Sequence, residues 1–254
     1  MISLVTDSGA LPQPRDSFTL RIVSAVQAYG INVPFLDVWQ GNGCLFSRMD
    51  GVLTIAGIPQ ETEETALFIA SCGVNEILCA EETAQVLGLS PTEAGPILHR
   101  KQPGEPVPVP ADFPSPRALY QVLSDCEGEH FPVPEFEPFY LDTSHRLRHG
   151  TAAAVLAEQD GKPAACALAL AVTDTAALLT AAAVCPPFRH RGLGSQMIEQ
   201  LAGQLPGREI FLFRSEWENR EFYEQLGFVC CGRWAQCQSQ ERILEGRREQ
   251  DEML

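Results

Sequence analysis

One stretch decides how this chain folds: Val184-Cys185-Pro186-Pro187-Phe188-Arg189-His190-Arg191-Gly192-Leu193-Gly194-Ser195. The preceding run, 176–184, is apolar and long enough for a buried strand. After the stretch, Met197, Ile198 and Leu201 recur at helical spacing. The sequence therefore predicts a strand, a tight turn and the start of a helix.

The predicted turn has the properties of an anion-binding site. Glycines at 192 and 194 leave the backbone accessible, and the first N–H groups of a helix have no intrahelical partner. The helix dipole adds partial positive charge there. Arg189, His190 and Arg191 add side-chain charge in a chain whose net charge is −15. These features favour a phosphate or pyrophosphate ligand.

Two familiar phosphate motifs do not fit this turn. A dinucleotide fingerprint would need a third glycine where Met197 stands, and a P-loop would need a lysine, which is missing nearby. The turn instead resembles the acyl-CoA-binding motif of the GNAT superfamily of acetyltransferases, Arg/Gln-x-x-Gly-x-Gly/Ala, through Arg189-x-x-Gly192-x-Gly194. A glycine-bearing turn with chance arginines is the alternative for this motif alone.

A second motif strengthens the resemblance. Asn219-Arg220-Glu221-Phe222-Tyr223-Glu224-Gln225-Leu226-Gly227-Phe228 is similar to the family pattern Asn-x-x-Phe-Tyr-x-x-Leu-Gly-Phe. The resemblance implies that Tyr223 lies near the acyl-CoA sulfur and protonates the leaving thiolate, and that Asn219 shapes the cofactor side. A phenol suits this role because it stays protonated at neutral pH. Taken without context, an aromatic residue on a short helix is usually part of a core.

The resemblance also implies how acetyl-CoA binds. In the GNAT fold the strand before the turn diverges from the next strand, and the pantetheine arm lies in the gap. Backbone groups would bind that arm, and the amides of the turn would bind the pyrophosphate. The predicted cofactor-binding residues are Ala183, Val184, Arg189, His190, Arg191, Gly192, Leu193, Gly194, Ser195 and Asn219. No metal is predicted.

The resemblance assigns no general base. Many family members carry a glutamate on the strand before the turn, but residues 176–184 include no carboxylate. Glu216 and Glu218 are weak candidates, with ordinary surface charge as the alternative. Cys185 could suggest an acyl-cysteine intermediate, although a structural cysteine and direct transfer are favoured.

The order of predicted elements recurs in the two halves of the chain. A helix over 15–29 precedes three short strands, a helix, a strand and a helix that ends near Gly88. The second half repeats three strands, a helix, a strand and a helix that ends at Gly227. This recurrence predicts two copies of one α/β unit. A GNAT-like mixed sheet flanked by helices is expected in the C-terminal domain, with a smaller GNAT-like N-terminal domain, so that the chain is a tandem.

Composition suggests where the domains divide. Six prolines within 101–116 disfavour regular structure and predict a linker. The expected domains are 1–100 and 117–238, followed by a charged tail, 239–254. The first half carries Ile58-Pro59-Gln60-Glu61-Thr62-Glu63-Glu64-Thr65 at the place of the turn, and its three carboxylates would repel a phosphate. This half is therefore expected to serve packing, a homodimer or one wall of the acceptor site.

The net charge argues against nucleic acid as a partner, because such binding depends on Lys and Arg neutralising phosphates. With only two lysines, a lysine-rich membrane patch is not expected, and no run reaches roughly 18 apolar residues. The N-terminus shows no secretory signal. Nine irregularly spaced cysteines fit neither a zinc pattern nor a disulfide framework, which predicts a cytoplasmic protein.

The leading hypothesis is an acetyl-CoA-dependent N-acetyltransferase that acts on an amine of a small molecule or peptide by direct attack on the thioester. A non-catalytic acyl-CoA-binding sensor or interaction protein is the alternative, and a different phosphate-bearing ligand is a third. The acceptor stays open.

Overall fold

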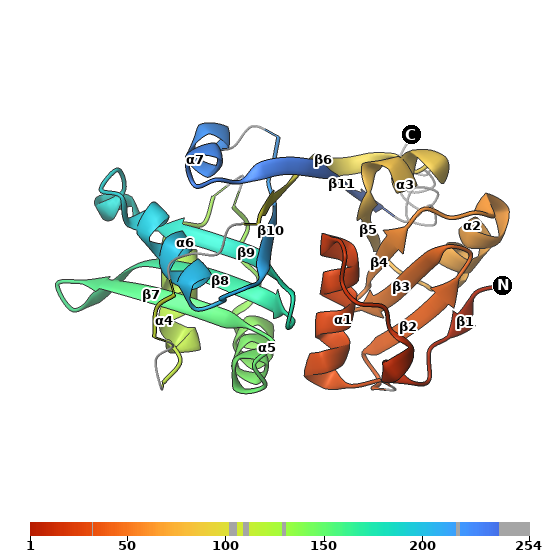
Figure 1. The fold of residues 1–254 in the computed structure, drawn as a ribbon, viewed down its shortest axis with the longest axis horizontal. Helices are drawn as coiled ribbons and strands as arrows, with labels where there is room; N and C mark the ends of the chain where they lie inside the picture. Colours follow the sequence, from red (N-terminus) through yellow and green to blue (C-terminus); the bar gives the residue numbers. More distant parts are fainter. Residues whose placement is uncertain (32, 102–105, 109–111, 129–130, 217–218, 239–254) are drawn as a thin grey trace, which may run out of the picture. The chain divides into compact units, whose positions relative to one another are not determined.

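The computed structural model describes residues 1–31, 33–101, 106–108, 112–128, 131–216 and 219–238. These residues form two compact units (Figure 1). Unit 1 contains the described residues of 1–97, 214–216 and 231–238, and unit 2 contains those of 98–213 and 219–230. Glu218 and the tail 239–254 lie outside the described residues.

Unit 1 is a mixed sheet with helices on both faces. Its strands follow the order β1-β2-β3-β4-β5-β11-β6. Helix α1 begins where the Asp16 carboxylate accepts the amides of Phe18 and Thr19, both at 2.9 Å. The elements are β1 (Ser3–Leu4), η1 (Ser8–Ala10), α1 (Ser17–Tyr29), β2 (Leu36–Gly41), β3 (Cys44–Met49), β4 (Val52–Gly57), α2 (Thr62–Ser71), β5 (Glu76–Ala80), α3 (Glu81–Val86) and β6 (Pro91–Arg100).

Alternation along the strands of unit 1 separates two apolar layers. Phe46, Leu53 and Ile55 pack with Ile69 of α2 and Ile77 of β5, and all five side chains are buried. The intervening residues of β3 and β4 point to the opposite face, where α1 contacts these two strands. Apolar burial on both faces therefore fixes the register of this sheet.

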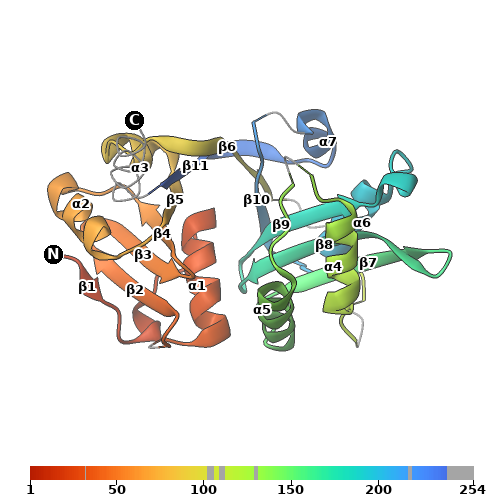
Figure 2. The same ribbon diagram turned by 180° about the vertical axis from the view of Figure 1, so that it is seen from behind.

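Unit 2 repeats this plan. Its elements are α4 (Pro116–Asp125), α5 (Phe136–Arg148), β7 (Ala153–Gln159), β8 (Lys162–Val172), β9 (Ala176–Val184), η2 (Pro186–Phe188), α6 (Leu193–Gly203), β10 (Glu209–Phe213), α7 (Arg220–Gln225) and β11 (Val229–Gln238), whose end belongs to unit 1. Helix α6 covers one face of the sheet, and α4 and α5 cover the other (Figures 1 and 2).

The predicted repetition of the two halves is confirmed in the pairing of the strands. In unit 1, β2, β3 and β4 are antiparallel, and α2 crosses over to the parallel strand β5. In unit 2, β7, β8 and β9 are antiparallel, and α6 crosses over to the parallel strand β10. The predicted strands and helices of both halves are present within a few residues of their expected bounds.

The two short helices that end near Gly88 and Gly227 share one capping geometry. Leu89 N–H donates to Ala84 C=O at 2.9 Å, and Phe228 N–H donates to Tyr223 C=O at 3.0 Å. Both glycines have positive φ, 65° and 78°. This is the Schellman arrangement, in which glycine takes the left-handed position after the helix. The recurring Leu-Gly-apolar triplet of the sequence therefore has a physical cause.

Strands β6 and β11 were not predicted. Both run from one compact unit into the other: β6 leaves unit 1 after Ile97, and β11 joins unit 1 at Cys231. Strand β6 is hard to recognise in the sequence because it contains Gly95 and two prolines, which usually interrupt strands. A methyl group on Gly95 would clash with Arg214 C=O, so this glycine allows two backbones to approach. The domain boundaries at 100 and 117 stay a prediction.

An ion pair within unit 2 gives a test of its packing. Arg100 of β6 donates two hydrogen bonds to the Glu199 carboxylate of α6, at 2.8 and 3.0 Å, and its side chain is only 10% exposed. Glu199→Gln should lower the free energy of unfolding by about 1–2 kcal/mol in urea titration, because a nearly buried guanidinium loses its counter-charge while Glu199 itself is partly screened by water. Glu224→Gln, which breaks the exposed pair with Arg220, is the control. Equal effects of the two substitutions would contradict the expectation.

Candidate functional site: the β9–α6 turn

The turn between β9 and α6 leaves a group of backbone amides without partners. Gly192 precedes α6 with φ 79° and makes no side-chain cap, and His190 also has a positive φ of 60°. Among the described residues, no group accepts a hydrogen bond from the amides of 190–195. The start of α6 therefore presents several N–H donors together with the positive end of the helix dipole.

The three basic residues of the turn are exposed and lie beside these donors. Arg189 Nε donates to Val184 C=O at 3.0 Å, which holds its guanidinium near the end of β9. The Arg191 guanidinium lies over the Phe188 ring, 5.7 Å from its centroid. Within the described part of the chain, no carboxylate forms a salt bridge with Arg189, His190 or Arg191. The positive charge of the turn is therefore available to an anion.

Strand β9 diverges from β10 before it reaches the turn. The parallel pairing runs from Ala176 opposite Glu209 to Leu179 opposite Leu212 and then stops. Residues 180–184 continue in β9, and 181–184 keep their pairing with β8 as far as Val184 opposite Ala165. The last five residues of β9 therefore have one edge that β10 does not pair.

The register shows which residues use that unpaired edge. Cys185 N–H donates to Ala164 C=O of β8 at 2.9 Å, so Cys185 directs its polar groups toward β8. Backbone polar groups alternate between the two edges of a strand. Ala183 therefore also points to β8, whereas Ala182 and Val184 point to the unpaired edge. The bond that Val184 C=O accepts from Arg189 agrees with this direction. Ala182 was not recognised from the sequence.

The second motif packs directly on the first. A methyl group placed on Gly194 would lie 3.4 Å from Phe222 Cζ and 3.7 Å from Val184 Cγ2, so α7 lies against the turn and the end of β9. The Tyr223 ring contacts Phe222 and Phe228 edge-on, with centroids 5.1 and 5.7 Å apart. The partly buried Tyr223 is therefore held next to the turn by two aromatic neighbours.

The remaining residues of the second motif shape α7. Asn219 precedes this helix with φ 49°, a left-handed conformation that asparagine tolerates better than most residues. Its side chain makes no capping hydrogen bond. Asn219 therefore has a backbone role at the start of α7.

The two glycines of the turn act for different reasons. Gly192 has a positive φ, and a methyl group added to it would meet nothing within 4 Å, so its requirement is conformational. Gly194 lies inside α6, and its requirement is the close approach of Phe222 and Val184. The turn thus needs one glycine for its backbone and one for its packing.

The candidate base Glu216 is engaged in an ion pair. Arg233 donates to its carboxylate at 2.8 Å and to Glu81 at 2.7 Å. The hydrogen bond from Arg233 lowers the pKa of Glu216 below its ordinary value. A lowered pKa makes a carboxylate a weaker base, which argues against this candidate. Glu218 lies outside the described residues.

Cys185 is buried beneath the turn. Its Sγ lies 3.8 Å from Asp125 Oδ2 and 3.8 Å from Pro163 C=O, and its side chain packs with α4 and β8. Burial raises the pKa of the Cys185 thiol to about 11, so the thiol is protonated at neutral pH. A buried thiol of this kind supports the structural interpretation of Cys185.

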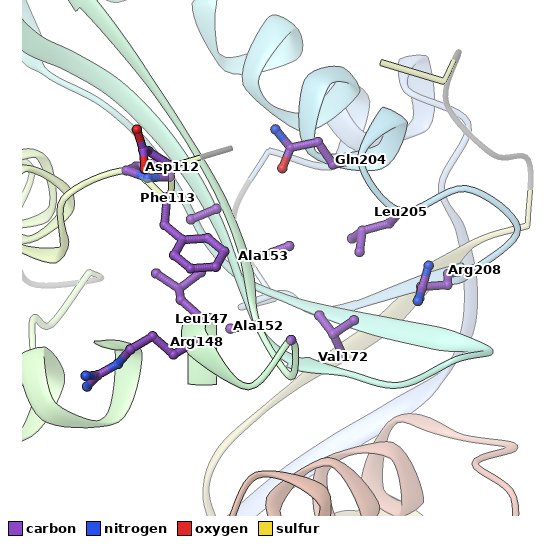
Figure 3. A pocket seen from close by; sticks show the side chains of 13 residues that line it. Asp112, Phe113, Leu147, Arg148, Ala152, Ala153, Val172, Gln204, Leu205 and Arg208 are labelled. Atoms are coloured by element: carbon purple, nitrogen blue, oxygen red, sulfur yellow. The ribbon is translucent and has the colours of Figure 1, made fainter. Parts of the chain in front are cut away.

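The cavity drawn in Figure 3 lies at the other end of unit 2. It has a volume of about 300 Å³, and Gln204 and Leu205 line it just beyond the C-terminus of α6. Phe113 and Leu147 also line it, as does Arg208, whose Nε donates to Thr173 C=O at 2.6 Å. Helix α6 is about 16 Å long, so this cavity is separate from the β9–α6 turn.

The corresponding place in unit 1 is already filled. Asn42 Oδ1 accepts the amide of Glu61 at 2.6 Å, and Asn42 C=O accepts the amide of Gln60 at 3.0 Å. Glu63 and Glu64 lie in the first turn of α2. Asn42 therefore accepts hydrogen bonds from the backbone amides before α2, and the glutamates add negative charge there. The turn before α6 has unpartnered amides and basic side chains instead.

The chain is similar to known proteins in both its sequence and its fold. Residues 117–228 match the model of the acetyltransferase (GNAT) family. None of the curated proteins compared with the chain matches it. Residues 117–228 thus form a GNAT-family domain, and the family implies acyl transfer from an acyl-CoA.

Solved structures support this assignment at the level of the fold. A GCN5-related N-acetyltransferase from Kribbella flavida is 18% identical, covers 87% of this chain and 95% of its own, and has a TM-score of 0.58. One from Sphaerobacter thermophilus is 13% identical, with coverages of 91% and 87% and a TM-score of 0.59. A tandem GNAT protein from the clavulanic acid biosynthesis pathway is 15% identical, covers 91% of each chain and has a TM-score of 0.54. The predicted GNAT-like fold is confirmed.

None of the helices in the described part of the chain has the length and apolar character needed to cross a bilayer.

The burial of Cys185 predicts its reactivity. In the native protein at pH 7.5, iodoacetamide should leave Cys185 unmodified, because a pKa of about 11 leaves fewer than about one thiolate in 1,000 molecules. Exposed Cys230 is the internal control and should be labelled. Peptide mass spectrometry measures both sites. Labelling of Cys185 at the rate of Cys230 would contradict its assignment as a buried, protonated thiol.

Proposed function

We propose that this protein is an acetyl-CoA-dependent N-acetyltransferase whose cofactor site is the β9–α6 turn of unit 2. The observation that carries the proposal is the combination of unpartnered amides at 190–195, three exposed basic side chains and an unpaired edge of β9. Coenzyme A has the matching features, a pyrophosphate followed by an amide-bearing arm. The site therefore has features that match the pyrophosphate and the amide-bearing arm of this ligand.

In this proposal the turn and the strand bind different parts of the ligand. The amides of 190–195, with Arg189, His190 and Arg191, hold the pyrophosphate. Ala182 and Val184 bind the pantetheine amides along the unpaired edge, and Ala182 replaces Ala183 in this role because of the strand register. On binding, the Val184 carbonyl gives up the hydrogen bond from Arg189 and accepts one from the pantetheine arm instead. The Arg189 guanidinium is then free to bind the pyrophosphate.

The acetyl thioester supplies an activated carbonyl, and the chain orients it. A backbone amide of β9 near the point of divergence polarises the carbonyl as the amine attacks. Tyr223 then donates its phenolic proton to the departing thiolate, and the proton that the acylated nitrogen releases restores the phenol. Glu216 is bonded to Arg233 and residues 176–184 carry no carboxylate, so in this proposal the acceptor enters as an uncharged amine and the general base stays unassigned, with Glu218 as the remaining candidate.

The acceptor class rests on the charge of the chain. A net charge of −15 attracts cationic molecules at long range, which favours a polyamine, an aminoglycoside or a peptide amine. A second function, that of a non-catalytic acyl-CoA sensor, is favoured by the same engaged glutamate and by the carboxylate-free strand. Turnover of acetyl-CoA across a panel of amines separates the two.

The role of the turn predicts a selective loss of affinity. Gly192→Ala should raise the dissociation constant of coenzyme A at least tenfold in calorimetry, because the substitution strains the left-handed residue that starts α6. Gly207→Ala is the matched control, since Gly207 has φ 75° and open surroundings in the same unit. Both substitutions should cost about 1 kcal/mol of stability. Coenzyme A binding that is unchanged in Gly192→Ala would argue against the turn as the binding site.

The role of Tyr223 predicts a loss of rate without a loss of substrate affinity. Tyr223→Phe should lower kcat about 100-fold, the low end for a general acid, while KM for acetyl-CoA stays within about twofold. Tyr120→Phe is the control, because it removes a hydroxyl that bonds Pro134 C=O at 3.0 Å, away from the turn. Steady-state thiol release measures both variants. An unaltered kcat in Tyr223→Phe would remove this residue from the mechanism.

A further inference from the structure

We infer that Thr180 and Arg146 are positioning residues, which hold a paired bulge in strands β8 and β9 and thereby set the unpaired edge of β9 for an acyl-CoA. The inference rests on the proposed function, which it deepens by naming the side chains that prepare the strand. Neither residue belongs to the two sequence motifs.

The bulge interrupts the β8–β9 ladder at one place. Leu168 lies opposite Ala181, and Ala169 then lies opposite Leu179, which leaves Thr180 as an extra residue on β9. Ala171 lies opposite Leu178, which leaves Leu170 as an extra residue on β8. A bulge bends its strand and increases the local twist. The last residue of β9 that pairs with β10 is Leu179, directly before Thr180.

Side chains make hydrogen bonds to the backbone N–H and C=O of Leu170, the extra residue on β8. Leu170 N–H donates to Thr180 Oγ1 at 3.1 Å, and this hydroxyl donates to Leu178 C=O at 3.2 Å. Leu170 C=O accepts from Arg146 Nη1 at 3.0 Å. A peptide group that leaves the ladder is costly when nothing replaces its hydrogen bonds. Thr180 and Arg146 replace both of them.

Arg146 is built into unit 2 as a fixed donor. Its side chain is 8% exposed, and its Nε donates to Asp142 Oδ1 at 2.7 Å, one turn earlier in α5. Helix α5 covers the face of the sheet opposite α6 (Figure 2). The planar guanidinium can hold Asp142 and Leu170 at the same time, which a lysine ammonium would do with poorer geometry.

The bulge also decides which way the end of β9 faces. Ala177 and Leu179 pack in the apolar cluster under α6, and after the extra residue Ala182 and Val184 pack in that same cluster. Regular alternation from Leu179 would instead place Ala181 and Ala183 under α6. Because of the extra residue, the side chains of Ala182 and Val184 face α6, as those of Ala177 and Leu179 do. The backbone groups of Ala182 and Val184 are those at the unpaired edge.

Substitutions at Thr180 test the inference through binding of coenzyme A. Thr180→Val removes the hydroxyl at constant shape and should raise the dissociation constant about tenfold in calorimetry, whereas Thr180→Ser should stay within about twofold of the unaltered protein. Thr173→Val is the matched control: the Thr173 hydroxyl donates to Ala176 C=O at 3.2 Å and accepts Ala176 N–H at 3.3 Å, joining the same strands at their hairpin. Urea titration should show a midpoint shift for Thr173→Val at least as large as that for Thr180→Val, because Thr173 is buried and Thr180 is exposed, with weaker coenzyme A binding only in Thr180→Val.

Steady-state kinetics adds a signature of positioning: KM for acetyl-CoA should rise in Thr180→Val while KM for the amine stays unchanged. Arg146→Lys should weaken coenzyme A binding in the same direction. If the unaltered protein binds no coenzyme A, both the proposed function and this inference are overturned. If the unaltered protein binds it and Thr180→Val binds as tightly as Thr173→Val, the inference alone is overturned.

Discussion

The candidate site depends on the divergence of β9 from β10. Strand β9 pairs with β8 as far as Val184 but with β10 only as far as Leu179. The unpaired edge offers donors and acceptors to an extended amide-bearing ligand, as an added strand would use them. Backbone groups of this kind cannot be deleted by a side-chain substitution. Their direction can be changed only through the bulge and the turn that bound the edge on its two sides.

Unit 1 has the same strand and helix topology as unit 2 but lacks the unpartnered amides and basic side chains of the β9–α6 turn. Its crossover from β4 through α2 to β5 matches the crossover from β9 through α6 to β10. At the start of α2, however, Asn42 accepts the Glu61 amide, and glutamates follow in the first helical turn. At the start of α6 the amides keep no described partner, and Arg189 and Arg191 belong to the same turn. On a shared fold, local side chains therefore distinguish the turn proposed to bind an anion from the turn before α2.

The chemistry of the site is carried by few side chains. Tyr223 is fixed between Phe222 and Phe228, and Phe222 contacts the turn at Gly194, so the two sequence motifs form one packed surface. Cys185 below the turn is buried and protonated, and Glu216 is held by Arg233. The proposed catalysis is thus mainly placement and polarisation by backbone groups, with one phenol as the proton donor.

The sequence by itself determined the parts of this protein that depend on neighbours along the chain. The strand, turn and helix around Arg189 and Gly192, the tyrosine motif and the repeated order of elements all follow from local periodicity and glycine conformation. Tertiary structure alone decided the rest. Strands β6 and β11 pair with partners distant in sequence, and Gly95 with its prolines conceals the first of them. That Ala182 and Val184, and not Ala183, face the unpaired edge follows from the paired bulge at Thr180 and Leu170. The sequence of 176–184 does not reveal this bulge, because every position except Thr180 is apolar and suits either face of the strand.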